Sequence, residues 1–180
     1  MEAVMGCRYS IQTGHLRLDP VSWTDLEDVV RLKASAGVTG RLASGVCSRV
    51  LSEQDMMTDL MTWGREGVGM FAVRQQDSFI GLAGVQPSST TADCHELQFA
   101  ILPHARDTAL SRQATSMALA FAHAAGVGRI ISYVRDNDII ARQVFGGAGM
   151  SLCTEQPECC GPDILLYHSL RGAPAGNSMH

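Results

Sequence analysis

The sequence predicts a single α/β domain built on a mixed, mainly antiparallel central sheet flanked by helices. The chain has 180 residues, which suits one domain with a sizeable core. Extended apolar runs occur in hairpin pairs, whereas the stretch Glu96–Ala125 has the pattern of strand, loop and helix. Because a strand–helix–strand unit implies a parallel crossover, the sheet is expected to be mixed.

The N-terminal part predicts a strand and a helix after a loose lead-in, Met1 to Gly14. Apolar and polar residues alternate in His15–Asp19, which favours a strand. Ser22, with Asp25 three residues later, is typical of a helix N-terminus. The helix that follows has an apolar face of Leu26, Val29, Val30 and Leu32.

A second helix is expected after a short helix or loop over Val38–Val50. Ser52 is the predicted cap, with Asp55 in the first turn. The predicted inward face carries Met56, Met57, Leu60 and Met61. This methionine cluster either fills gaps in the core or lines a pocket.

The central part predicts a hairpin and a third strand. Met70–Arg74 and Phe79–Val85 are the hairpin strands, joined by a turn at Gln75–Ser78. A polar loop, Gln86–Ala92, leads to the next strand, Cys94–Leu102, which Pro103 closes.

A helix is predicted from Leu110 to Ala125, where neither glycine nor proline occurs, and Gly126 is expected to end it in a left-handed conformation. The polar turn His104–Thr108 joins this helix to the preceding strand. Such a loop directs the free N–H groups of the helix to one point, which attracts anions and above all phosphates.

The C-terminal part predicts further strands and a short helix. The strands are Arg129–Val134, Ser151–Thr154 and Ile164–Leu170. The helix covers Asp138–Phe145 and is closed by glycines, and the tail from Arg171 is expected to be frayed.

Composition argues against several classes of function. The net charge is −4 and no basic run occurs, so nucleic acid is not an expected partner. No apolar run is long enough to span a membrane, and no signal peptide is visible. We therefore expect a cytoplasmic protein.

The six cysteines are expected to be reduced, small apolar fillers. A metal site at Cys153, Cys159 and Cys160 is the alternative, but no C-x-x-C pair is present and adjacent cysteines rarely bind one ion. No metal is predicted.

The segment from Glu96 resembles the acyl-CoA-binding core of the GNAT N-acetyltransferase superfamily, in its RimJ/RimL-like branch. That family has Glu-Leu-Gly-Tyr in a strand, then Pro, then an Arg-x-x-Gly-x-Gly/Ala loop that opens a helix. Here Glu96–Phe99 occupies the first motif, Pro103 the proline, and Arg106 opens the loop motif. The resemblance extends over about residues 15–170, and it implies a twisted sheet that is splayed at its centre.

The resemblance implies that acetyl-CoA is bound by the strand end and the loop. A strand bulge at Ala100, Ile101 and Leu102 would polarise the thioester carbonyl. The loop residues are Arg106, Asp107, Thr108, Ala109, Leu110 and Ser111. Ala109 replaces a glycine, and Asp107 places a carboxylate where pyrophosphate would bind. Such a charge could cost roughly 1–2 kcal/mol at intermediate dielectric.

A third resembling region is Arg135–Met150, which matches the family's Asn-x-x-Ser segment. Asp138 stands at the asparagine position and Ala141 at the serine position, so the serine hydroxyl that could donate a proton is lost. Arg142 is expected to meet a phosphate at the adenosine end. All these departures involve cofactor contacts.

Glu96 is the expected catalytic base, acting through water, and a solvated strand-end carboxylate is the alternative reading. The resemblance implies acetyl transfer from acetyl-CoA to a primary amine, on a protein N-terminus or a small molecule, by a monomer or homodimer. The competing hypothesis is a non-catalytic GNAT-fold module that binds a ligand or a protein. An Asp107 carboxylate at the phosphate position would favour the module, and an open channel between the central strands would favour the enzyme.

Overall fold

The computed structural model describes residues 9–35, 46–105, 107–154 and 161–172. They form one eight-stranded sheet with the strand order β1-β2-β3-β4-β5-β6-β8-β7. The strands are β1 (Ile11–Thr13), β2 (Leu16–Pro20), β3 (Met70–Gln75), β4 (Ser78–Pro87), β5 (His95–Ile101), β6 (Arg129–Arg135), β7 (Ser151–Leu152) and β8 (Ile164–Leu170). Only the β5–β6 pair is parallel within this described sheet, which confirms the predicted mixed, mainly antiparallel α/β architecture.

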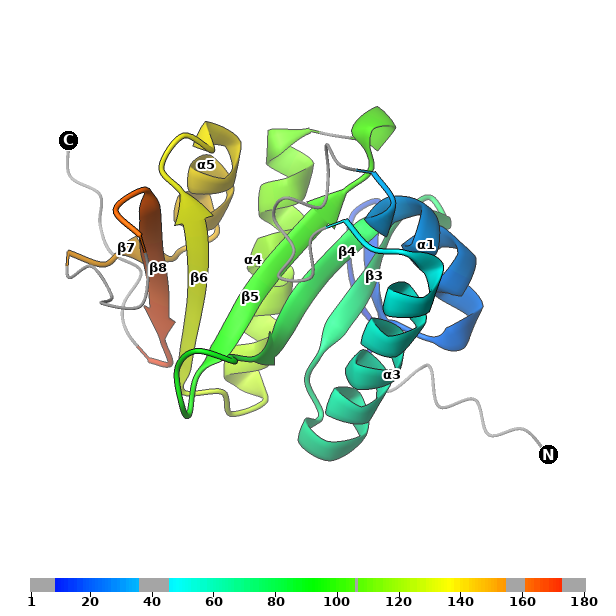
Figure 1. Cartoon of the computed structure of the whole chain (residues 1–180), viewed down its shortest axis with the longest axis horizontal. Coiled ribbons are helices and arrows are strands. Elements are labelled where there is room, and N and C mark those ends of the chain that lie inside the picture. Colours follow the sequence, from blue (N-terminus) through cyan, green and yellow to red (C-terminus); the bar gives the residue numbers. More distant parts are fainter. Residues whose placement is uncertain (1–8, 36–45, 106, 155–160, 173–180) are drawn as a thin grey trace.

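Helices cover both faces of the sheet (Figure 1). One face carries α1 (Leu26–Lys33) and α3 (Arg49–Glu66), and the other carries α4 (Thr108–Ala124) and α5 (Ile139–Gly147). Two short 3₁₀ helices, η2 (Trp23–Asp25) and η3 (Pro103–Ala105), precede α1 and α4. The predicted strand–loop–helix unit is therefore β5, η3 and α4.

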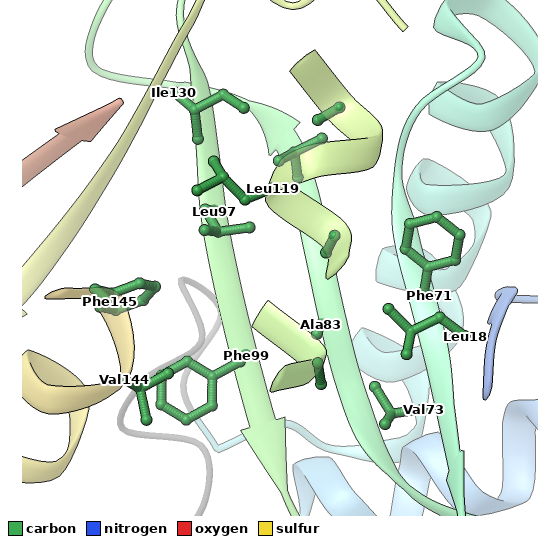
Figure 2. Packing of buried hydrophobic residues seen from close by; sticks show 14 of the residues in the cluster. Leu18, Phe71, Val73, Ala83, Leu97, Phe99, Leu119, Ile130, Val144 and Phe145 are labelled. Carbon is green, nitrogen blue, oxygen red and sulfur yellow. The ribbon is translucent and has the colours of Figure 1, made fainter. Parts of the chain in front are cut away.

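The hydrophobic core follows the alternation of the strands. Leu97, Phe99 and Ile101 of β5 point to the α4 side, where the packed cluster includes Phe71 and Val144 (Figure 2). Ala100 and Leu102 point to the α1 and α3 side. Because successive strand side chains alternate between faces, Glu96 and Gln98 belong to the α3 side as well.

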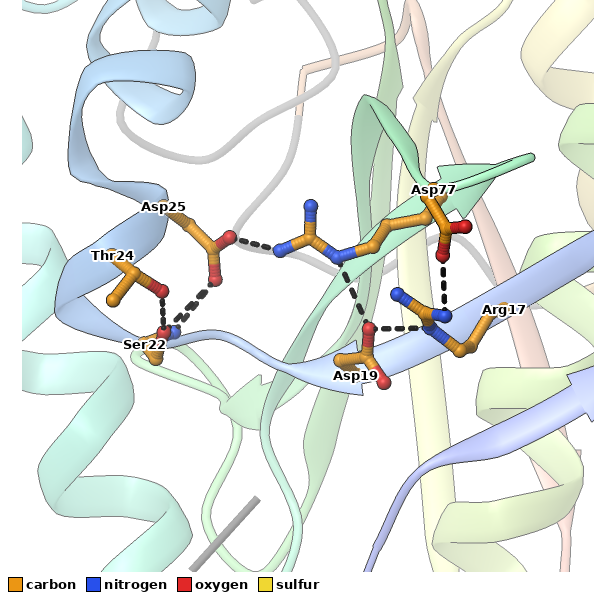
Figure 3. Close-up of polar contacts among 7 residues, drawn as sticks. Arg17, Asp19, Ser22, Thr24, Asp25 and Asp77 are labelled. Carbon is orange, nitrogen blue, oxygen red and sulfur yellow. Dashed lines mark hydrogen bonds and ion pairs between the residues drawn. The ribbon is translucent and has the colours of Figure 1, made fainter. Parts of the chain in front are cut away.

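A network of charges fixes η2 to the sheet (Figure 3). The Arg74 guanidinium on β3 binds Asp25 and also donates to Asp19 Oδ2 at 3.1 Å. Arg17 donates to the same Asp19 oxygen at 2.9 Å and to Asp77 at 2.7 Å. Asp25 in turn accepts from the Ser22 backbone N–H at 3.0 Å, as in a capping box, which confirms the helix N-terminus predicted at these two residues.

Two predictions near the N-terminus were wrong. Part of the expected loose lead-in is strand β1, which pairs with β2 across a turn where Gly14 takes a φ of 59°. The cap of α3 is Ser48, which accepts from Leu51 N, whereas Ser52 lies buried inside the helix and donates to Ser48 O. The Val38–Val50 prediction lies partly outside the described residues.

The inward face of α3 also differs from the prediction. Met56 is buried, but Met57 and Met61 are 50% and 54% exposed. Consecutive helical residues are rotated by about 100°, so a face containing position 56 also contains 59 and 63 but excludes 57 and 61. Asp59, which the predicted inward face did not include, is therefore buried on this side of the helix.

The other boundaries lie close to those expected. The turn of the β3–β4 hairpin has positive φ at Gln76 and Asp77, and Gly126 after α4 has a φ of 109°. The helix α5 continues through Gly146 and Gly147, which were expected to close it. Predictions for Cys159 and Cys160 lie outside the described residues.

Candidate functional site

The strands β5 and β6 separate beyond their first residues. Their parallel register includes only His95↔Ile130 and Glu96↔Ile131, after which the two strands diverge towards α4 and α5 (Figure 1). At the closed end of this gap, the buried Ser132 hydroxyl of β6 donates to Leu97 O at 2.8 Å. Glu96 therefore lies where the splay begins.

The backbone of β5 alternates between β4 and this gap. Leu102 N donates to Ile80 O at 2.8 Å, so Leu102 and, two residues earlier, Ala100 direct their N–H groups to β4. The N–H of Ile101 consequently faces the β6 side. The register of the described β4–β5 pair is continuous from Gly81↔Ile101 to Pro87↔His95, so the bulge that the resemblance implied is not found there. The strand leaves β6 by diverging as a whole.

The N-terminus of α4 is capped by Asp107. Its Oδ1 accepts from Ala109 N at 2.9 Å, and its backbone carbonyl accepts from Ser111 N at 2.9 Å. Thr108 is the first helical residue, and Ala109 is not among the described residues with positive φ, so alanine is unstrained at this position. Arg106 lies outside the described residues.

A pocket of about 330 Å³ adjoins this helix terminus. Asp107, Ala109 and Leu110 line it on one side, and residues 13–16 of the β1–β2 hairpin line it on the other. The loop residues that the sequence grouped are thus brought together beside a hairpin that the sequence did not predict.

The Glu96 carboxylate has the surroundings of an available base. Burial raises its pKa, and no hydrogen bond or ion pair of this carboxylate occurs among the described residues. The neighbouring His95 is occupied, because its Nε2 lies 2.7 Å from Glu66 Oε2 at the end of α3. Glu96 pairs in register with Gln86 of β4.

The third region divides into two parts. Asp138 caps α5 by accepting from Ala141 N at 3.0 Å, and both residues line a pocket of about 130 Å³ with Tyr133 and Phe145. Arg142 instead donates to Asp136 Oδ1 at 2.9 Å, so its guanidinium is already paired.

Sequence reasoning missed Asp59 of α3. The carboxylate is 3% exposed, and burial raises its pKa to about 6 even though Gln86 donates a hydrogen bond to it and Lys33 lies nearby. The signal was present in the helical spacing, since Asp59 follows the buried Met56 by three residues.

Among the described residues, no three histidine, cysteine or acidic side chains are arranged to hold a metal ion, and Cys153 is a half-buried free thiol. Among the same residues, no helix combines the length and hydropathy that a membrane span requires.

Comparison with solved structures shows the same fold in acetyltransferases. An acetyltransferase from Agrobacterium tumefaciens superposes with a TM-score of 0.75 at 19% identity, covering 89% of this chain and 93% of that chain. The ribosomal-protein-S5-alanine acetyltransferase from Vibrio fischeri gives 0.72 at 11% identity, with 91% and 97% covered. RimL, a ribosomal L7/L12 alpha-N-protein acetyltransferase in complex with coenzyme A, gives 0.70 at 12% identity, with 89% and 97% covered.

Sequence comparison gives the family. No curated protein matches the chain at a significant level. The family model described as the acetyltransferase (GNAT) domain matches residues 15–151. Since this match spans most of the chain and agrees with the splayed sheet, the protein belongs to the GNAT acetyltransferase family.

Proposed function

We propose that the protein is an acetyl-CoA-dependent N-acetyltransferase that acts on a primary amine, with Glu96 as the catalytic base. The observation that carries the proposal is the half-buried Glu96 carboxylate at the closed end of the β5–β6 gap, which has no hydrogen-bond or ion-pair partner among the described residues. The ribosomal-protein acetyltransferases among the similar structures support a protein N-terminus as one class of acceptor.

The described residues fit the phosphates of acetyl-CoA on one condition. The start of α4 offers N–H groups to an anion, but Asp107 already accepts from Ala109 N. A phosphate oxygen can take this position only when the Asp107 side chain turns away. Arg142 requires a similar exchange, because it is paired with Asp136.

Each residue then has a defined task. Bound acetyl-CoA supplies a thioester whose carbonyl carbon bonds to the amine nitrogen while the carbon–sulfur bond breaks. Glu96 accepts the proton that the amine loses. The N–H of Ile101, which faces the gap, donates to the carbonyl oxygen as negative charge develops. With Ala141 in place of serine, the thiolate leaves without a proton from that position, which a thiol pKa near 8.5 allows.

The second candidate is a non-catalytic module that binds a ligand or protein through the same gap. The Asp107 cap favours it, because a carboxylate occupies the N–H group that pyrophosphate would use. The packing of Phe99 against Phe145, with ring centroids 5.3 Å apart, also fills part of the space beside α5.

An acetylation assay separates the two candidates. Thiol release from acetyl-CoA is followed with a panel of peptides bearing free α-amino groups and with short diamines. The enzyme hypothesis predicts amine-dependent release that Glu96→Gln lowers about 100-fold or more, the lower range for a general base. Absence of release with every amine, or full activity in Glu96→Gln, would contradict the proposal.

A further inference from the structure

The second half of α3 is tied to the sheet on both sides of Glu96. Asp59 of α3 accepts from the Gln86 side-chain amide at the end of β4. About two helical turns further along α3, Glu66 Oε2 lies 2.7 Å from Nε2 of His95, at the start of β5. The acidic residue at the reaction centre is thus bracketed by two links to the same helix.

The strand register places Gln86 beside Glu96. The two residues are directly opposite in the β4–β5 pair, with side chains on the same face. Cβ atoms of such pairs lie about 4.5–5.5 Å apart. Both residues are half-buried, and they lie on the same face of the sheet.

The Asp59 contact fixes the orientation of the Gln86 amide. An ionised carboxylate can only accept, so the Gln86 Nε2 group faces Asp59. The Oε1 atom of the same planar amide therefore points away from Asp59. Because Gln86 and Glu96 are opposite in the register, this acceptor lies on the same face of the sheet as the Glu96 carboxylate.

Stability does not account for a carboxylate at position 59. The side chain is 3% exposed, and its charged surroundings are Asp55 on the same helix and Lys33 on α1. Lys33 already pairs with Asp55 at 2.7 Å. An apolar residue of similar volume would pack here without the cost of burying a charge. What a carboxylate provides at this position, and an apolar side chain would not, is the hydrogen bond that it accepts from Gln86.

We propose that Gln86 Oε1 and the Glu96 carboxylate together bind the two N–H groups of a primary amine, and that Asp59 is the positioning residue for Gln86. This inference rests on the proposed function. A neutral primary amine must keep its lone pair for the attack, so its two N–H groups are what the protein can bind. Two adjacent acceptors suit this group, whereas a secondary amine leaves one acceptor unpaired. The pair therefore sets a preference for primary amines.

The test compares a primary amine with its N-methyl derivative. The amine is the one that the wild-type protein acetylates fastest among free α-amino peptides and short diamines. The wild type is expected to prefer the primary amine about tenfold, the effect of one buried hydrogen bond. Gln86→Met, which keeps the chain length, should lose about tenfold in kcat/KM for the primary amine and little for the N-methyl amine.

Variants at position 59 distinguish the orienting of the Gln86 amide from the mere filling of space by the residue 59 side chain. Asp59→Leu should reproduce the loss seen in Gln86→Met, whereas Asp59→Asn keeps an acceptor for Gln86 Nε2 and should stay within about threefold of wild type. Gln54→Leu, at an exposed position of α3, is the matched control and should leave kcat/KM unchanged. Acetyl-CoA affinity, measured in parallel, should stay within twofold throughout.

The outcomes are distinguishable. Wild-type rate and preference in Gln86→Met would overturn this inference and leave the proposed function intact. Acetylation of no amine by the wild type would overturn both. Should Gln86→Met fail to fold, Gln86→Asn, which retracts the amide by one methylene, takes its place, and unchanged amine preference in that variant overturns the inference.

Discussion

At the scale of single residues, Asp59 has the surroundings that conflict most with its charge. Burial raises its pKa to about 6, well above the ordinary aspartate value of 3.8. The folded protein therefore binds a proton here at a pH where the unfolded chain has lost it. The free energy of unfolding is expected to fall as the pH rises from about 4 to above 6.

Asp59→Asn is expected to remove this pH dependence. With a pKa of about 6 in the folded protein against an ordinary value of 3.8, the stability of the variant relative to the wild type should rise by about 2 kcal/mol between pH 4 and pH 7.5. Urea unfolding at the two pH values measures it. The exposed Asp93→Asn should change stability equally at both pH values. If the stability difference between Asp59→Asn and the wild type were also the same at both pH values, the raised pKa of Asp59 would be refuted.

Glu96 gives a kinetic counterpart. Burial raises its pKa, and a base must be deprotonated to act. The kcat/KM for amine acetylation should therefore decline on the acid side at a pH above the ordinary glutamate value of 4.5. The residual activity of Glu96→Gln should lack this limb. A wild-type profile that stays flat down to pH 4.5 would argue against Glu96 as the base.

At the scale of secondary-structure elements, the Arg74 network attaches η2 and α1 to the sheet. Asp25 has a side chain that is 4% exposed, and Arg74 is its cation. Arg74→Gln should lower the free energy of unfolding by about 3 kcal/mol, because it leaves a buried carboxylate uncompensated. Chemical denaturation checks this.

Arg17→Gln is the control within the same network. Arg17 is 38% exposed, and its partner Asp77 is 81% exposed. Its loss should cost at most about 1 kcal/mol. Equal losses of stability in Arg74→Gln and Arg17→Gln would contradict this prediction, because the buried Asp25 would then depend on its cation no more than an exposed carboxylate does.

Close approach of β4 and β5 predicts a second pair of variants. A Cβ added at Gly81 would lie 2.1 Å from Ala100 O and 2.9 Å from Ile101 Cα, both backbone atoms. Gly81→Ala should therefore destabilise the protein by about 1–3 kcal/mol, the usual cost of overpacking. Gly64→Ala in α3, where nothing lies within 4 Å, should stabilise it by up to about 1 kcal/mol. In thermal unfolding, the Tm should be lower than that of the wild type for Gly81→Ala and higher for Gly64→Ala.

At the scale of the whole molecule, local sequence signals predicted most of the fold. The hairpin of β3 and β4, the unit of β5 and α4, and the strands β6 and β8 all follow from periodicity and from glycine or proline at their ends. Short-range patterns were misleading where two serines lie four residues apart. Ser48 and Ser52 both suit a helix cap in sequence, but the helix begins at Arg49, directly after Ser48.

The candidate site was less predictable because its parts come from distant segments. Asp107 and Asp138 could be singled out in sequence, but their role as helix caps depends on the backbone geometry. The Arg142–Asp136 pair and the Asp59–Gln86 contact depend on tertiary placement as well. Sequence spacing therefore found the β5–α4 loop but not the α3 side of the gap.

The most direct measurement is calorimetric titration of the purified protein with acetyl-CoA, beside the Asp107→Asn variant. We expect saturable binding to the wild type and about tenfold tighter binding to Asp107→Asn, because the amide removes the negative charge that repels pyrophosphate. Failure of both proteins to bind millimolar acetyl-CoA would contradict acetyl transfer and leave the non-catalytic module as the function of this fold.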